Sequence, residues 1–119
     1  MKNSQLWLIG AGVTLLQLII GNAMVFYGVI PQLLGIHAVL AAILLVIGIY
    51  GYSRVKNSLE KRILMGIIGL LVIASILGYL FLSYGESIVL IIHFIFALGV
   101  LSNFSVLYGI ERGSLYSNK

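Results

Sequence analysis

The sequence contains no Asp, Glu, Lys or Arg between Lys2 and Arg54. A helix rises about 1.5 Å per residue and needs about 20 residues to cross a hydrocarbon core of about 30 Å, so this stretch is long enough to cross twice. A Tyr-Gly pair near its middle is followed closely by Pro31, which suits the first turn of a helix. The stretch therefore predicts two membrane-spanning helices, at about 5–26 and 31–53.

A second hairpin is predicted after a polar connector at 53–62. Apolar residues dominate again at about 63–83 and at about 87–108, and a Tyr-Gly pair lies between these two stretches. Each stretch has the length of a membrane span. The residues from 109 to 119 are more polar, and we expect them to form a short tail after the fourth helix.

Composition excludes an ordinary soluble domain. Hydrophobic residues make up 61% of the chain and charged residues 8%, and the mean hydropathy is +1.17, whereas soluble domains carry about 25% charged residues. We predict an all-α polytopic membrane protein in contact with the lipid bilayer. Residues 1–119 would form one four-transmembrane-helix bundle built from two parallel repeats of a helical hairpin, at about 5–53 and 61–108.

The basic residues predict the orientation of the chain in the membrane. All of them fall on one side of a four-span arrangement: Lys2, Arg54, Lys56, Lys61, Arg62, Arg112 and Lys119. The other two turns carry only Glu86. Because basic residues are retained on the cytoplasmic side, we expect a multi-pass protein of the cell (plasma) membrane with both termini in the cytoplasm. The net charge of +4 does not indicate nucleic acid, since the basic residues form no continuous stripe.

The two halves share a pattern of chemically distinctive residues. Each half has a glycine, then a Tyr-Gly pair, then a histidine, then an alanine four residues further on. The first set is Gly21, Tyr27, His37 and Ala41, and the second is Gly78, Tyr84, His93 and Ala97. Parallel repeats related by an axis along the membrane normal are a known way to build a shared site. We interpret the pattern as a duplicated hairpin.

His37 and His93 are the only histidines in the chain. An imidazole at membrane depth is a candidate for function because lipid offers it no hydrogen-bond partner, although a single one near a helix end can simply bond to a loop carbonyl. Both histidines lie early in their helices, so both are expected in the outer half of the membrane. They can meet only if the second and fourth helices are neighbours, which we therefore expect.

Haem is the ligand that two facing imidazoles suit best. Zinc normally takes three or four protein ligands, and the chain has no cysteine to supply them. Haem iron takes two axial imidazoles and is otherwise held by apolar contacts. We expect one haem b per chain, with His37 and His93 as axial ligands of its iron. Gly21, Gly78, Ala41 and Ala97 would leave room for it, while Tyr27 and Tyr84 either belong to the interfacial aromatic belt or bond to a propionate.

The chain also resembles one half of the members of a known family. Gln17 and Gly21, then the turn, then Leu34 and His37 with small residues after it, look like half of a haem A synthase. The resemblance covers nearly the whole chain. It implies two four-helix bundles per family member, each with histidines on its second and fourth helices facing one haem, and His37 and His93 match those positions.

Departures from that family bear on activity. Its catalytic half has a glutamate three residues before the first histidine and an arginine directly after it, but this chain has Leu34 and Ala38 there, with Leu90 and Phe94 around His93. Its members commonly carry outer-loop cysteines, and this chain has none. The resemblance is therefore to the half that holds haem b as a cofactor, and no catalytic residue is predicted.

These observations favour a small membrane cytochrome that transfers electrons, or a haem-stabilised subunit, in a respiratory assembly. One haem near the outer face cannot carry electrons across a core of about 30 Å, so a partner is needed. The partner could be a quinol, a respiratory-complex subunit or a second copy of the chain. Two alternatives stay open: a half-length haem A synthase-like oxidoreductase acting as a homodimer, and a haem-free accessory or assembly subunit.

Overall fold

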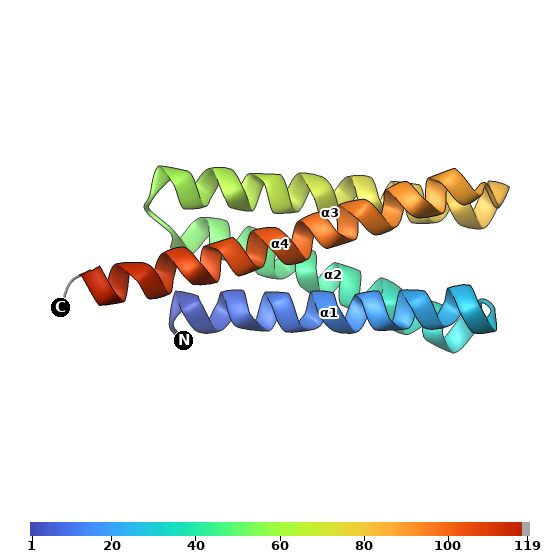
Figure 1. Cartoon of the computed structure of the whole chain (residues 1–119), viewed down its shortest axis with the longest axis horizontal. Coiled ribbons are helices and arrows are strands. Elements are labelled where there is room, and N and C mark those ends of the chain that lie inside the picture. Colours follow the sequence, from blue (N-terminus) through green and yellow to red (C-terminus); the bar gives the residue numbers. More distant parts are fainter. Residues whose placement is uncertain (118–119) are drawn as a thin grey trace.

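The computed structural model describes residues 1–117 as four long α-helices joined by short turns (Figure 1). The helices are α1 (Asn3–Tyr27), α2 (Pro31–Arg54), α3 (Ser58–Tyr84) and α4 (Ser87–Ser117). No β-strand occurs in this described part of the chain. Each helix is long and apolar enough to cross a membrane. The predicted fold class is confirmed, and the chain is a multi-pass membrane protein.

Each of the two hairpin turns begins with a glycine that has a positive φ. Gly28 follows α1 with a φ of 99°, and Gly85 follows α3 with a φ of 70°. Residues with a Cβ rarely adopt positive φ, whereas glycine does so without steric cost. Pro31 then occupies the first turn of α2, where its missing N–H leaves no helical hydrogen bond unmade. The turn signals in the sequence therefore act where they were expected.

α3 begins at Ser58, before the predicted start at 63. Asn57 caps the helix, because its side-chain oxygen accepts hydrogen bonds from the backbone N–H groups of Leu59 at 2.8 Å and Glu60 at 3.4 Å. An asparagine cap satisfies N–H groups that have no partner within the helix. The cap lets α3 extend through residues whose polarity had indicated a connector.

α4 continues to Ser117, so the prediction of a non-helical tail is wrong for 109–117. Residues 118–119 lie outside the described part of the chain. Adding residues to an existing helix is far easier than starting one, and no proline follows to stop it. In addition, the carboxyl groups of Glu111 on α4 and Glu60 on α3 lie close enough for one of them, when protonated, to donate a hydrogen bond to the other.

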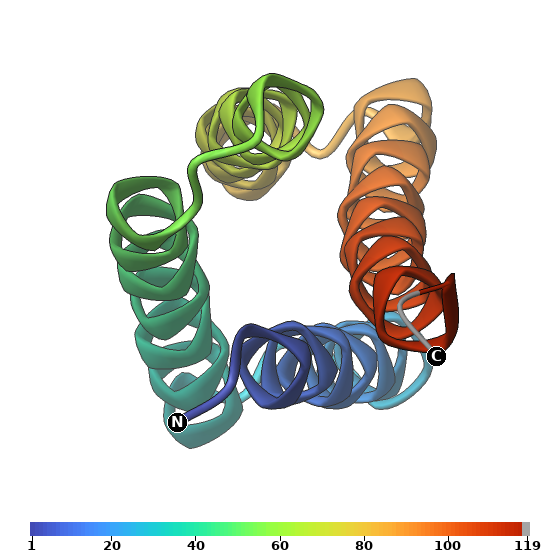
Figure 2. The ribbon, with the colours of Figure 1, turned by 90° about the vertical axis from the view of Figure 1, so that its left-hand side faces the viewer.

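The four helices stand at the corners of a square when viewed along the bundle (Figure 2). α1 packs against α2 and α4, and α3 packs against the same two helices. Within the described residues, α2 and α4 make no close backbone contact, since they occupy opposite corners. The expectation that α2 and α4 are neighbours is therefore wrong. Their histidines can meet only across the central axis.

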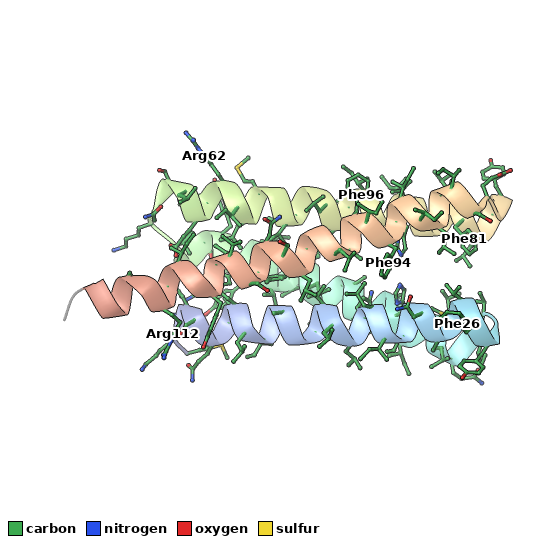
Figure 3. The ribbon with its side chains drawn as sticks, in the orientation of Figure 1. Phe26, Arg62, Phe81, Phe94, Phe96 and Arg112 are labelled. Carbon is green, nitrogen blue, oxygen red and sulfur yellow. The ribbon has the colours of Figure 1, made fainter. Side chains whose placement is uncertain are left out.

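One end of the bundle is packed solid. The start of α1 and the end of α4 lie at this end, and Arg62 and Arg112 lie there too, whereas Phe26 and Phe81 lie toward the other end (Figures 1 and 3). The fully buried side chains Trp7, Leu64, Ile67, Phe104 and Leu107 belong to the half of the bundle near the termini. The half toward the two hairpin turns contains the cavity described next.

Candidate functional site

A cavity of about 690 Å³ lies within the bundle, in the half toward the hairpin turns. All four helices line it, and Leu44, Leu71 and Val100 connect it to the packed core. Its lining contains no Asp, Glu, Lys or Arg, and its polar members are Thr14, Gln17, Asn22, Ser75, Tyr79 and the two histidines. Ligand pockets in proteins typically measure about 300–1,000 Å³ and are mostly apolar with a few placed polar groups. This cavity has the character of a site for an apolar cofactor.

His37 and His93 face one another across this cavity. Their ring centroids are 6.3 Å apart, and the ring planes are inclined by 52°. The two rings come from α2 and α4, which are diagonal in the bundle (Figure 2). The predicted convergence of the two imidazoles is therefore present, although the helices that carry them are not adjacent.

A hydrogen bond fixes His93. Its Nδ1 lies 2.6 Å from the backbone oxygen of Ala74 on α3. A carbonyl oxygen can only accept, so Nδ1 must carry the proton and donate, which leaves the lone pair of a neutral ring on Nε2. Histidines that bind metals usually donate their other ring N–H to such an acceptor, because this bond sets the tautomer and the orientation of the ring. His93 is thus held in the form that a metal ligand requires.

His37 is held through its backbone. The side-chain amide of Gln17 on α1 donates from Nε2 to the His37 carbonyl oxygen at 2.7 Å, which is a hydrogen bond between α1 and α2. The Nδ1 atom of His37 is buried and completes no hydrogen bond. The Gln17 backbone lies beside this ring, at the position equivalent to that of Ala74 beside His93. The two histidines therefore share a setting, with a backbone group of α1 or α3 beside each ring, but only His93 completes the hydrogen bond at Nδ1.

Gly21 and Gly78 lie against the imidazoles themselves. A Cβ at Gly21 would lie 3.4 Å from Cε1 of His37, and a Cβ at Gly78 would lie 3.2 Å from Cε1 of His93. The sequence pattern predicts that these glycines leave space directly for a ligand. The space that each glycine leaves is taken by the edge of a histidine ring, so the glycines act by admitting the imidazoles to the centre of the bundle.

The remaining predicted site residues divide into two groups. Ala41 and Ala97 line the cavity one helical turn beyond the histidines, as their spacing predicted. Tyr27 and Tyr84 are 84% and 75% exposed and are not among the residues that line the cavity. Both tyrosines lie at the ends of their helices, where an aromatic belt residue is expected. The structure does not bring them to the histidines.

The cavity follows the predicted duplication closely. Residues of α1 that line it match residues of α3 at one constant separation along the chain, and residues of α2 match those of α4 at another. The matched lining pairs include Thr14 and Leu71, Gln17 and Ala74, Leu18 and Ser75, Gly21 and Gly78, Asn22 and Tyr79, Leu34 and Leu90, His37 and His93, Ala41 and Ala97, and Leu44 and Val100. The cavity is thus built around an approximate two-fold axis that runs along the bundle.

The separation of the two histidine rings is compatible with a bis-histidine haem. If the Nε2 atoms of both rings pointed at one iron, at about the 2.0 Å typical of a metal–imidazole bond, the ring centroids would lie about 6 Å apart. The observed centroid separation is 6.3 Å, and the two ring planes are inclined by 52°. In the described residues, no group of three or more His, Cys, Asp or Glu is placed to hold a bare metal ion.

Two contacts were not predicted from the sequence, one at this site and one in the packed half of the bundle. The carbonyl of Ala74 is the acceptor for His93, and no side-chain pattern identifies a backbone group as a partner. The fit between Trp7 and Gly51 was also missed, although a Cβ at Gly51 would lie 2.6 Å from the indole ring. A glycine facing an aromatic residue across two helices is visible only once the helices are placed. The internal repeat could have indicated Ala74, because it occupies the place of Gln17.

No protein-family model, curated protein or solved structure significantly matches the chain.

Proposed function

We propose that this chain is a small membrane cytochrome that holds one haem b between α2 and α4, with His37 and His93 as the axial ligands of the iron. The single observation that carries the proposal is the 6.3 Å separation of the two ring centroids across one cavity. Two unrelated imidazoles have no reason to converge in this way, because burying them costs free energy unless something satisfies them.

Different residues of the chain would bind the haem iron, make room for the two rings and surround the macrocycle. His93 presents Nε2 as a ligand because its Nδ1 donates to Ala74. Gly21 and Gly78 admit the two rings to the axis, and the apolar lining excludes water from the macrocycle. A haem bound in this way supplies one-electron transfer. With His37 and His93 both bound to it, the iron would have no open position for oxygen or a substrate, which favours an electron carrier over an enzyme.

The charge distribution supports a proposed orientation of the chain in the membrane. Basic residues flank the ends of the helices near the termini, and Glu86 is the charged residue of the hairpin turns. By the positive-inside rule, both termini would be cytoplasmic and the cavity would lie nearer the outer face of the plasma membrane. Electrons would have to pass to or from a partner at that face, because the membrane core of about 30 Å lies below the haem.

The partner would be a quinol, a subunit of a respiratory complex or a second copy of the chain. The resemblance to one half of a haem A synthase supports the haem-holding role. It does not support catalysis, because Leu34 and Ala38 stand where the catalytic half of that family has a glutamate and an arginine.

The experiment is an absorption spectrum of the detergent-purified protein, with pyridine haemochrome analysis for haem type. We expect a sharp reduced α-band of a six-coordinate b-type haem at one haem per chain. His37→Ala and His93→Ala should each abolish it, while Ser75→Ala, which removes a cavity-lining hydroxyl that bonds to the Leu71 carbonyl of its own helix, should retain it. A colourless protein after expression with haem supplied, or a band that survives both histidine substitutions, would refute the proposal.

A further inference from the structure

The cavity has two long edges where helices of different hairpins meet, one between α1 and α4 and one between α2 and α3. The approximate two-fold axis relates these edges, so a position on one has an equivalent on the other. Some lining residues are also exposed on the outside of the bundle, among them Tyr79 at 70% and Phe94 at 38%. Because lipid surrounds a membrane bundle, single side chains separate the cavity from the bilayer at these edges.

The residues that directly follow the two histidines differ in size. Phe94 follows His93 and Ala38 follows His37, and both line the cavity at equivalent places in the repeat. Figure 3 shows Phe94 on the side of α4 that faces α1. Ala38 offers only a methyl group and is exposed on the outside of the bundle. An aromatic ring therefore stands at one edge of the cavity and a methyl group at the other.

Ala38 lies on the side of α2 that faces α3. Gly48 of α2 meets Ile68 of α3, whereas Gly51 of α2 meets Trp7 of α1. A helix turns about 100° per residue, so Ala38 lies about 80° around α2 from Gly48 and about 140° from Gly51. Its methyl group therefore belongs to the edge between α2 and α3.

Tyr79 borders the same edge from the other side. It lies about three helical turns beyond Ile68 and so on the face of α3 that meets α2. Its side chain lines the cavity and is largely exposed. Among the four adjacent pairs of helices in the described residues, α2 and α3 also pack least extensively. The α2–α3 edge is therefore the least closed side of the cavity.

We propose that this edge, with Ala38 at its centre, is a lateral window through which a flat apolar ligand enters and leaves the cavity from the bilayer. The inference rests on the proposed function in taking haem as that ligand. The macrocycle is largely apolar and favours the hydrocarbon region over water. It would meet the window beside His37, the residue next to Ala38. Phe94 obstructs the equivalent edge, so exchange would use one side of the bundle.

The first test is the rate of haem exchange in lipid nanodiscs. Uptake by haem-free protein is followed by absorbance, and release by transfer of haem to apomyoglobin. We expect Ala38→Phe to slow both by the same factor, about tenfold or more, because a ring must leave a packed edge before the ligand passes. Ala42→Phe is the matched control, because Ala42 lies one turn further along α2 and is exposed outside the cavity lining.

A gate and a damaged site are distinguished by affinity. A narrower window changes uptake and release alike and leaves Kd unchanged, whereas a clash with bound haem raises Kd. The swapped variant Ala38→Phe/Phe94→Ala moves the ring to the other edge and should return uptake to near the wild-type rate. Val29→Phe adds bulk where the turn after α1 lines the cavity, and it should leave the rates unchanged.

Three results would overturn the inference. They are wild-type exchange rates in Ala38→Phe, a raised Kd in that variant, and slowing by Val29→Phe in its place, which would put the entrance at the turn end. The expected pattern is specific, because only a window at Ala38 predicts both the slowing and its reversal by Phe94→Ala.

The second test needs no haem. His37 and His93 are the only histidines, so NMR of labelled histidine rings in haem-free protein reports on the cavity alone. Lipid that carries a nitroxide on its acyl chain should broaden these signals in the wild type and in Ala42→Phe, with loss of most of the broadening in Ala38→Phe. Equal broadening in all three would contradict a window. A chain that never binds haem would refute the proposed function, while this measurement would still decide the window.

Discussion

His37 and His93 approach to a ring separation of 6.3 Å although the backbones of their helices make no close contact. α1 and α3 separate the two helices at opposite corners of the bundle, and each contributes a glycine that lets one ring reach the axis. Any group bound by both rings would therefore connect two helices whose backbones make no close contact. This diagonal arrangement gives ligand binding a structural role as well as a chemical one.

The first prediction is that haem stabilises the bundle through both rings. A ligand that binds only the folded state at a free concentration of 100 times its Kd adds about 2.7 kcal/mol to the free energy of unfolding. Thermal unfolding of the wild type in detergent should show this gain when haem is added, and the double variant His37→Ala/His93→Ala should show none. An equal gain in the double variant would mean that haem binds somewhere else.

The second prediction separates Gly78 from other glycines of α3. A Cβ at Gly78 would press on His93, while a Cβ at Gly69 meets nothing within 4 Å. Gly78→Leu should therefore displace the imidazole and give an inserted protein with little or no haem, measured as the ratio of haem absorbance to protein. Gly69→Leu is the control and should keep full haem. Full haem in Gly78→Leu would contradict the role given to this glycine.

The third prediction concerns the packed half of the bundle. A Cβ at Gly10 would lie 2.6 Å from the buried ring of Phe104, and overpacking of this kind costs about 1–3 kcal/mol. Gly10→Ala should lower the free energy of unfolding by that amount. Gly12→Ala, on the same helix with no atom within 4 Å, should instead raise it by up to about 1 kcal/mol through helix propensity.

A double variant checks the cause of that loss. Phe104→Leu shrinks the opposing side chain, so part of the cost of Gly10→Ala should be recovered when the two are combined. Residues in contact show such coupling, whereas distant residues add independently. Strict additivity of the two substitutions would show that they do not act on the same contact.

The fourth prediction tests the orientation. The chain has no cysteine, so single cysteines can be introduced directly. Glu86→Cys, in the turn between α3 and α4, should react with a membrane-impermeant maleimide in intact cells. Lys56→Cys, in the connector between α2 and α3, should react only after the cells are opened. The reverse pattern would place the termini and the cavity on the opposite sides of the membrane.

Local features of the sequence determined the number of helices, the position of their turns and the matching positions of the two histidines along α2 and α4. A charge-free stretch of sufficient length, Pro31 at the start of a helix and Tyr-Gly pairs at the turns each act over a few residues, so no knowledge of packing is needed to interpret them. The repeat of glycine and histidine likewise predicted which side chains would share a depth.

Packing between helices decided which helices are neighbours and toward which neighbour each side chain points. Nearly every face of these helices is apolar, so hydrophobic periodicity cannot say which helix lies beside which, and α2 and α4 proved to be diagonal. The pairing of His93 with the Ala74 carbonyl, the outward position of Tyr27 and Tyr84 and the contact of Gly78 with an imidazole follow from helix rotation. That rotation is set by many small contacts between residues far apart in the chain, which a linear pattern does not contain.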